Sequence, residues 1–159
     1  MNIECTIIDM RAPSWRSCDF SAFDTVFHVA GIAHADVGHT TPEQQELYYA
    51  VNTDLAMECA EKAKEAGVKQ FIFMSSMIIY GGRKFIDAKT VPAPANFYGN
   101  SKWLGDVGVR RLADEQFKTA VLRPPMIYGK GSLGNYPILA KIAKRLPFFP
   151  DVENRRSML

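Results

Sequence analysis

A serine, a tyrosine and a lysine follow one another in an order that suits the removal of a proton from an alcohol. Ser76 comes just after the apolar run Phe71–Met74, and Lys102 follows Tyr98 by four residues. Because four residues span about one helical turn, the Tyr98 phenol and the Lys102 amine can lie on one face. Tyrosine titrates near ~10, so a phenolate at neutral pH needs a neighbouring cation and a positively charged cofactor ring. These residues predict a site where a hydroxyl loses its proton.

A second pair, Tyr80 and Lys84, has the same spacing and tests how specific the pattern is. Two glycines lie between them and disfavour a helix, so their side chains need not share a face. Tyr98 instead precedes a long helical pattern that runs to Leu112. We therefore assign the chemistry to Tyr98 and Lys102, rather than interpreting them as polar residues at a solvated helix start.

The elements that must position these residues alternate between strands and helices, which predicts an α/β fold with a parallel sheet. The predicted strands are Ile3–Ile8, Asp24–Gly31, Phe71–Met74 and Phe117–Arg123, the last of which is ended by two prolines.

A long helix is expected between the second and third of these strands. Thr41, Pro42 and Gln44 form a capping-box signature at its start, and Gly67 marks its end. Its apolar stripe is predicted to repeat every fourth residue, at Leu47, Val51, Leu55, Cys59 and Ala63.

Composition narrows the class of protein. A chain of 159 residues predicts one domain, and a net charge of +2 favours neither nucleic acid nor a membrane surface as a partner. No apolar run approaches the ~20 residues of a membrane span, and the start lacks signal-peptide features, so a cytoplasmic location is expected. The three cysteines and three histidines have no metal-type spacing, so we predict no metal site.

Three runs resemble the extended, sugar-nucleotide-modifying branch of the short-chain dehydrogenase/reductase superfamily, which contains NAD-dependent epimerases and dehydratases. They are residues 71–81, 98–102 and 122–129, in the family's order and at roughly its spacing. The resemblance implies a Rossmann-like domain over residues 1–159, with the substrate-binding portion starting at 130–159. A Gly-x-Gly-x-x-Gly at 129–134 does not follow a strand or open a βαβ unit, so we reject it as the dinucleotide loop.

The resemblance also assigns residues to the cofactor and the substrate. Tyr98, Lys102 and Ser76 correspond to the catalytic residues, and Ser76 also contacts substrate. The remaining matches to cofactor-binding positions are Asp9, Met10, Ala30, Gly31, Asn52 and Pro125. Those to substrate-binding positions are Met126, Asn135 and Arg156. The implied cofactor is NAD, with NADP left open, the implied substrate is a UDP-sugar, and a homodimer is a family expectation.

The family's glycine-rich loop after its first strand has no counterpart, since Met1–Asp9 aligns with the family's third strand. We therefore expect an incomplete fold that lacks the first two strands, that is, a fragment.

The reaction expected of the intact protein is epimerisation of a nucleotide sugar through a transient 4-keto intermediate. Dehydratases of this branch carry Asp-Glu where Met77-Ile78 stands here, and neither residue transfers a proton, which disfavours dehydration. Met126 replaces an Asn common in epimerases. A keto-sugar reductase is the alternative, and a non-catalytic binding fragment is a hypothesis of another class.

Overall fold

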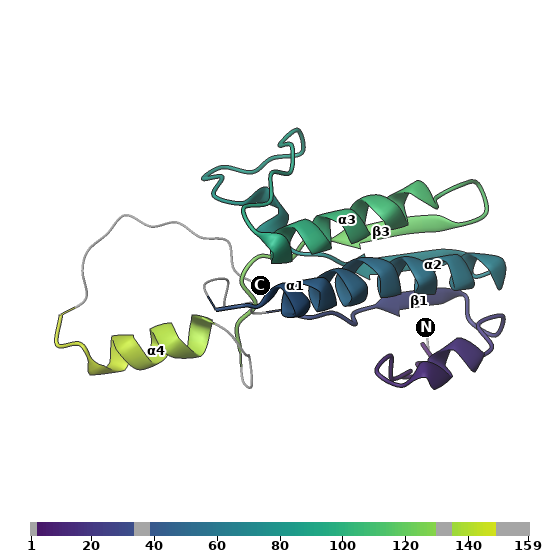
Figure 1. Cartoon of the computed structure of the whole chain (residues 1–159), viewed down its shortest axis with the longest axis horizontal. Helices are drawn as coiled ribbons and strands as arrows, with labels where there is room; N and C mark the ends of the chain where they lie inside the picture. The colour runs from purple at the N-terminus through teal and green to yellow at the C-terminus, as the bar shows by residue number, and fades with distance from the viewer. Residues whose placement is uncertain (1–2, 34–38, 130–134, 149–159) are drawn as a thin grey trace.

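The computed structural model describes residues 3–33, 39–129 and 135–148. Its sheet has three parallel strands in the order β1-β2-β3: β1 (Thr25–His28), β2 (Gln70–Met74) and β3 (Lys118–Leu122) (Figure 1). In the register, Phe73 of β2 pairs with His28 on one side and Val121 on the other. The prediction of a Rossmann-like parallel sheet with flanking helices is confirmed, and three of the four predicted strands form.

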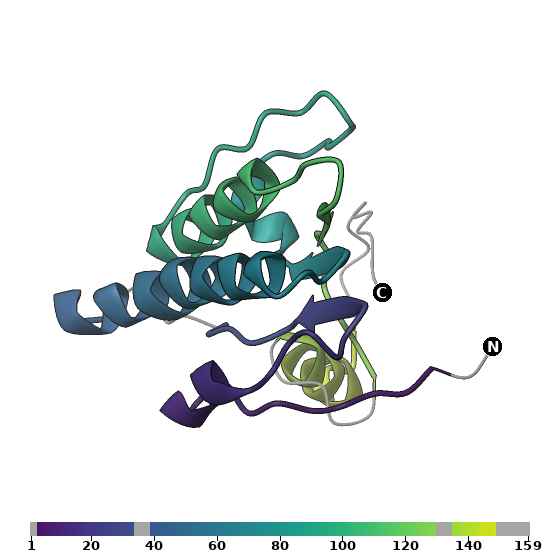
Figure 2. The same ribbon diagram turned by 90° about the vertical axis from the view of Figure 1, so that its right-hand side faces the viewer.

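The helices cover one face of this sheet (Figure 2). A continuous helical segment consists of α1 (Pro42–Tyr49), a π-helix η2 (Ala50–Asp54) and α2 (Leu55–Glu65), and it lies beside α3 (Phe97–Arg111). Two short 3-10 helices, η1 (Pro13–Ser17) and η3 (Met77–Tyr80), complete this part of the chain. All three strands run toward the same edge, so the segments that follow them meet there, as is typical of ligand sites in parallel sheets.

The core lies between β2 and the helices. Phe71 and Phe73 point from β2 toward small residues of α2, and Phe117 packs against Phe71 with ring centroids 6.2 Å apart. The buried face of α2 is formed by Ala56, Cys59, Ala60 and Ala63. Small side chains on this face let the helix approach the aromatic residues of the sheet closely.

The predicted helix signals are confirmed. Thr41 accepts a hydrogen bond from the Gln44 backbone at 3.3 Å, and the Gln44 side chain accepts one from the Thr41 backbone at 2.9 Å. Gly67 follows the end of α2 with φ +82°, a conformation that favours glycine.

Two predictions about these elements are wrong. Residues 3–8 form no strand, and Ile3 and Ile7 are 74% and 96% exposed, because no strand in the described part of the chain pairs with this segment. The apolar stripe of the long helix also changes face: Leu47 is exposed, whereas Asn52 is buried. The π-helix adds a residue to one turn, so a strict four-residue repeat does not stay on the sheet side.

Beyond the carboxyl edge of the sheet, Figure 1 shows α4 (Asn135–Arg145) apart from the other described elements. Its apolar residues Ile138, Leu139 and Ile142 are exposed. Within the described ranges, no helix has the length and apolar character needed to cross a bilayer.

Replacing a buried aromatic residue of β2 should destabilise the protein far more than replacing an exposed aromatic residue. Phe71 is 0% exposed and Phe85 is 91% exposed. We expect Phe71→Ala to lower the free energy of unfolding by about 3–5 kcal/mol, and the matched Phe85→Ala variant by less than about 0.5 kcal/mol. Urea unfolding followed by circular dichroism measures both, and equal losses would contradict the placement of the core.

Candidate functional site

The Lys102 amine lies at the carboxyl edge of the sheet, where β1 and β2 end. It donates a hydrogen bond to the carbonyl of Met74, the last residue of β2, at 3.3 Å. Its ammonium also lies 5.6 Å from the centre of the Phe73 ring. With only 5% of the residue exposed, burial lowers the pKa of Lys102 from its ordinary 10.5 to about 8. The amine therefore extends from α3 to the end of β2, the strand that precedes Ser76.

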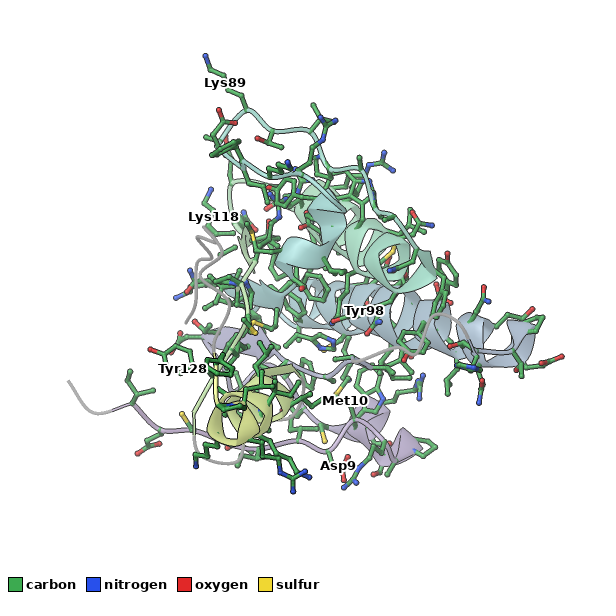
Figure 3. All side chains as sticks on the ribbon, turned by 90° about the vertical axis from the view of Figure 1, so that its left-hand side faces the viewer. Asp9, Met10, Lys89, Tyr98, Lys118 and Tyr128 are labelled. Carbon is green, nitrogen blue, oxygen red and sulfur yellow. The ribbon has the colours of Figure 1, made fainter. Side chains whose placement is uncertain are left out.

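Tyr98 lies one turn before Lys102, in the first turn of α3, and its phenol lies near the Ser76 side chain. The Asn96 side chain caps this helix by accepting a hydrogen bond from the Gly99 backbone at 2.9 Å. Figure 3 looks onto the carboxyl edge and labels Tyr98 near its centre. Burial raises the pKa of Tyr98 above its ordinary value of 10, a hydrogen bond with Ser76 lowers it, and the nearby Tyr48 raises it.

Ser76 is the second residue after the end of β2, and local geometry holds it there. It is the N-cap of η3, and its hydroxyl accepts a hydrogen bond from the Ile78 backbone at 3.2 Å. The next backbone N–H, that of Met77, donates to the Pro124 carbonyl at 3.2 Å, which ties this turn to the chain that follows β3. The structure thus places Ser76 near Tyr98, and Lys102 lies one turn further along α3 with its amine at the end of β2.

Gly31 lies against the amine of Lys102. A Cβ atom at Gly31 would lie 2.5 Å from the Lys102 Nζ and 2.9 Å from the Asn52 Oδ1. The missing side chain therefore leaves space that these two groups occupy. Ala30 is half-buried beside it, and both residues follow the end of β1, which stops at His28, earlier than predicted.

The Asn52 amide fixes the segment that follows Gly31. Its Oδ1 accepts a hydrogen bond from the Ile32 backbone at 2.9 Å, and its Nδ2 donates to the Ile32 carbonyl at 3.0 Å and to the Ser101 Oγ at 3.1 Å. Asn52 lies in the π-helix η2 and is fully buried, so it is not an exposed mid-helix residue. One side chain thereby links the end of β1 to α3, next to Lys102.

His28 is a packed core residue on the same side of the sheet. Its ring stacks between Phe71 and Phe73, with centroids 5.9 Å from each. Burial and then the charge of Lys102 lower the pKa of His28 to about 4. Its Nε2 has no hydrogen-bond partner among the described residues.

Other residues assigned by the resemblance lie around this centre. Figure 3 places Asp9 and Met10 on the segment below the sheet. Asp9 forms an ion pair with Arg11 at 2.6 Å, and that hydrogen-bonded guanidinium lowers the pKa of Asp9 to about 2. Met10 packs against the core. Pro125 and Met126 are half-buried beyond the end of β3.

Two assignments to the substrate are not described. Asn135 is the first residue of α4, but its side chain lies outside the described set, and Arg156 lies outside the described residues entirely. The same holds for most of the glycine pattern at 129–134.

A hollow of about 360 Å³ borders the site on the side of α1. It is lined by Ile32, His39, Thr40, Gln44, Leu47 and Tyr48. The Tyr48 ring meets the Tyr98 ring edge-on at a centroid distance of 5.8 Å, so the hollow adjoins the Tyr98 ring. Among the described residues, no cluster of His, Cys, Asp or Glu side chains has metal-binding geometry.

The sequence interpretation missed a polar cluster at the same edge. Asp106 is fully buried on α3 and binds Arg110 at 2.7 Å and Arg123, beyond β3, at 2.8 Å. Arg123 also donates to the Tyr80 hydroxyl at 2.7 Å. The four-residue spacing of Asp106 and Arg110 could have predicted their ion pair on one helix. The contacts of Arg123 with Asp106 and Tyr80 join distant segments and have no such signal in the sequence.

Parallel strands, helices on a sheet face and polar groups at the carboxyl edge define a Rossmann-like fold. Residues 4–152 match the NAD dependent epimerase/dehydratase family, and the chain belongs to that family.

The relatives are considerably longer. A UDP-glucose 4-epimerase of Vibrio cholerae is 32% identical over 142 residues, which are 84% of this chain and 43% of that protein. An N-acetyl-alpha-D-glucosaminyl-diphospho-ditrans,octacis-undecaprenol 4-epimerase of Escherichia coli O157:H7 is 34% identical over 77% of this chain and 37% of its own length. The chain therefore spans less than half the length of these curated relatives.

Solved structures confirm the fold. MoeE5 in complex with UDP-glucose and NAD superposes with a TM-score of 0.70 at 23% identity, over 82% of this chain and 44% of that one. A UDP-galactose 4-epimerase structure gives a TM-score of 0.68 at 23% identity, over 86% and 46%.

The lowered pKa of Lys102 predicts a stability that depends on pH. Between about pH 8 and the ordinary 10.5, the folded protein binds fewer protons at Lys102 than the unfolded chain, so stability rises with pH in this window. We expect the free energy of unfolding of the wild type, relative to Lys102→Met, to rise by about 3 kcal/mol across it. Urea unfolding at several pH values measures the difference, and a constant difference would contradict the buried placement of the amine.

Replacing the buried Asn52 amide should lower the free energy of unfolding more than replacing the more accessible Asn100 amide on α3. Asn52→Leu removes the partners of Ile32 and Ser101, and we expect a loss of about 2–3 kcal/mol. The matched Asn100→Leu variant loses one hydrogen bond to the Tyr49 hydroxyl and should cost less than about 1 kcal/mol. Chemical denaturation compares them, and the reverse order would refute the anchoring role of Asn52.

Proposed function

We propose that the intact protein is an NAD-dependent 4-epimerase of a nucleotide sugar that works through a transient 4-keto sugar. The observation that carries this proposal is the placement of Tyr98 beside Ser76, where Ser76 lowers the pKa of the phenol, one turn before the buried Lys102. Membership of the NAD dependent epimerase/dehydratase family and similarity to UDP-glucose 4-epimerases support it.

The residues at the carboxyl edge are compatible with NAD. The Lys102 ammonium has three N–H groups, and in the described chain its one hydrogen bond goes to the Met74 carbonyl, which leaves donors for ribose hydroxyls. Gly31 leaves the backbone next to that amine without a side chain. We assign the cofactor contacts to Asp9, Met10, Ala30, Gly31, Asn52, Tyr98, Lys102 and Pro125. NAD, when bound, accepts a hydride from the sugar carbon and returns it.

Tyr98 is the proposed general base. Its phenolate takes the proton of the sugar 4-hydroxyl as the C4 hydride leaves, and the phenol returns the proton when hydride comes back to the opposite face. Ser76, which bonds the same phenol, also holds the reacting oxygen. Lys102 is proposed to stabilise the phenolate, because the shifts of Tyr98 in the structure come from burial, Ser76 and Tyr48 and leave its pKa raised. A positive charge is needed to offset that rise.

The proposed substrate is a UDP-sugar, held by Met126, Asn135 and Arg156 in a substrate-binding portion that begins at 130–159. Arginine suits a diphosphate because its guanidinium forms paired hydrogen bonds with phosphate oxygens. NADP is the alternative cofactor. We also propose a cytoplasmic homodimer with no nucleic-acid partner. The exposed side chains of Leu47 on α1 and Leu104 on α3 are apolar residues that a second copy could cover.

Two other outcomes are tested alongside epimerisation. A keto-sugar reductase, the runner-up, uses the same Ser76, Tyr98 and Lys102. Met126 stands where many epimerases carry an Asn that meets the sugar nucleotide, so it bears on which sugar is the substrate. A non-catalytic binding fragment is the third outcome, in which these 159 residues do no chemistry and bind NAD poorly.

Replacing the Tyr98 hydroxyl should abolish most of the activity without unfolding the protein. The full natural polypeptide is incubated with NAD and UDP-glucose or UDP-galactose, and products are followed by proton NMR. We expect interconversion of the two sugars, with kcat lowered about 10²–10⁴-fold in Tyr98→Phe and Ser76→Ala. Tyr49→Phe, which removes a hydroxyl elsewhere on the helical layer, should retain activity.

The outcomes separate the three functions. Stoichiometric consumption of NAD(P)H with a keto sugar would identify a reductase. Absence of turnover together with absence of NAD binding by calorimetry would support the non-catalytic alternative. Full activity in Tyr98→Phe would overturn the assignment of the base.

A further inference from the structure

Arg123 connects the two elements that carry the site. It follows β3 directly, and its guanidinium binds both oxygens of Asp106, with Nε to Oδ2 at 2.8 Å and Nη2 to Oδ1 at 3.0 Å. Its third nitrogen, Nη1, donates to the Tyr80 hydroxyl at 2.7 Å. The charge also lies over the Tyr80 ring, 5.6 Å from its centre. One side chain thus contacts α3 and η3 simultaneously.

Both contacts lie one turn from the proposed catalytic groups. Asp106 comes four residues after Lys102 and eight after Tyr98, so the three residues lie along one face of α3. Tyr80 is the last residue of η3, which Ser76 caps at its start. The relative position of η3 and α3 sets the distance between the Ser76 hydroxyl and the Tyr98 phenol.

We propose that Arg123 is a positioning residue, which holds η3 and α3 in the register that brings Ser76 to Tyr98 and Lys102 to the end of β2. Asp106 is 0% exposed, and a buried carboxylate requires partners that satisfy both oxygens. Arg110, on the same helix, donates a hydrogen bond to Oδ1 at 2.7 Å. Arg123, which follows β3, donates one hydrogen bond to each oxygen. Backbone bonds from Ser75 to Leu122 at 2.8 Å and from Met77 to Pro124 at 3.2 Å reinforce the same junction.

The planar guanidinium is what makes this arrangement work. A bidentate carboxylate contact fixes the plane of the fork, and that plane aims the remaining nitrogen at Tyr80. A lysine at position 123 places one charged nitrogen near Asp106 but cannot hold both partners in fixed geometry. The catalytic roles of Ser76 and Tyr98 rest on the proposed function, whereas the contact that Arg123 makes between η3 and α3 is a feature of the structure itself.

The decisive experiment uses Tyr80→Phe, which removes one hydrogen bond and leaves the Asp106 ion pairs in place. We expect amide hydrogen exchange at Ile78, whose N–H bonds to Ser76, to accelerate about tenfold or more as η3 loosens. Arg123→Lys should also accelerate amide exchange at Ile78. It should also move the pKa of Lys102 from about 8 toward its ordinary 10.5, measured by carbon-13 NMR of the lysine ε-carbon, because water reaches the loosened turn.

The matched control is Lys64→Met, which breaks an ion contact at the opposite end of α3. Lys64 binds Asp114 at 2.6 Å and donates to the Leu112 carbonyl at 2.8 Å. This variant should lower the melting temperature without changing exchange at Ile78 or the pKa of Lys102. His28 and Tyr98, the other titratable groups near Lys102, are the same in all variants.

Unchanged exchange at Ile78 in Tyr80→Phe overturns the inference, whether or not Arg123→Lys folds. Acceleration there that Lys64→Met does not reproduce supports it, because a general loss of stability would affect both variants. None of these measurements needs NAD or a sugar. An intact protein that meets the expectation for Ile78 but fails to bind NAD would therefore refute the proposed function alone.

Discussion

The buried amine of Lys102 is the constraint around which the carboxyl edge is built. Removing a lysine from water is costly, as its lowered pKa of about 8 shows, so neighbouring elements must supply partners and space. The end of β2 offers the Met74 carbonyl, and the turn after β1 offers the empty side of Gly31. Asn52 then holds that turn in place through Ile32. Each of these features contacts the Lys102 Nζ or holds in place a group that does.

Close approach between helices makes that position reachable. A Cβ at Gly105 would lie against the backbone of Asn52, and one at Gly108 would lie 2.6 Å from the Met57 sulfur, so α3 approaches the long helical segment only because these residues are glycines. The Thr53 hydroxyl donates to the Ser101 carbonyl at 2.8 Å within the same contact. The glycines reduce intrinsic helix propensity, and the packing they permit offsets that loss.

Local sequence signals predicted most helices and strands, whereas the features that depend on contacts between distant elements could not be predicted from the sequence. The apolar run at Phe71, the capping box at Thr41 and the glycine at position 67 each have a local cause, so they were visible in the sequence. Residues 3–8 had the apolar pattern of a strand, but no described strand lies beside them to pair with, which a pattern alone does not reveal. The π-helix and the junction at Arg123 depend on packing between distant segments. The spacing of Tyr98 and Lys102 predicted a shared helix, whereas the buried environment of the amine emerged only in three dimensions.

The environment of Tyr98 indicates when the proposed base would be active. Burial favours the neutral phenol, and the hydrogen bond with Ser76 offsets this only in part, since the pKa of Tyr98 remains raised. Lys102 is mostly protonated at neutral pH because its pKa of about 8 lies above 7, so its charge is present before any ligand arrives. Under the proposed function, a phenolate therefore requires the further positive charge of a bound nicotinamide ring. Proton removal would then be coupled to occupancy of the cofactor site, which protects the empty protein from holding an unstabilised buried anion.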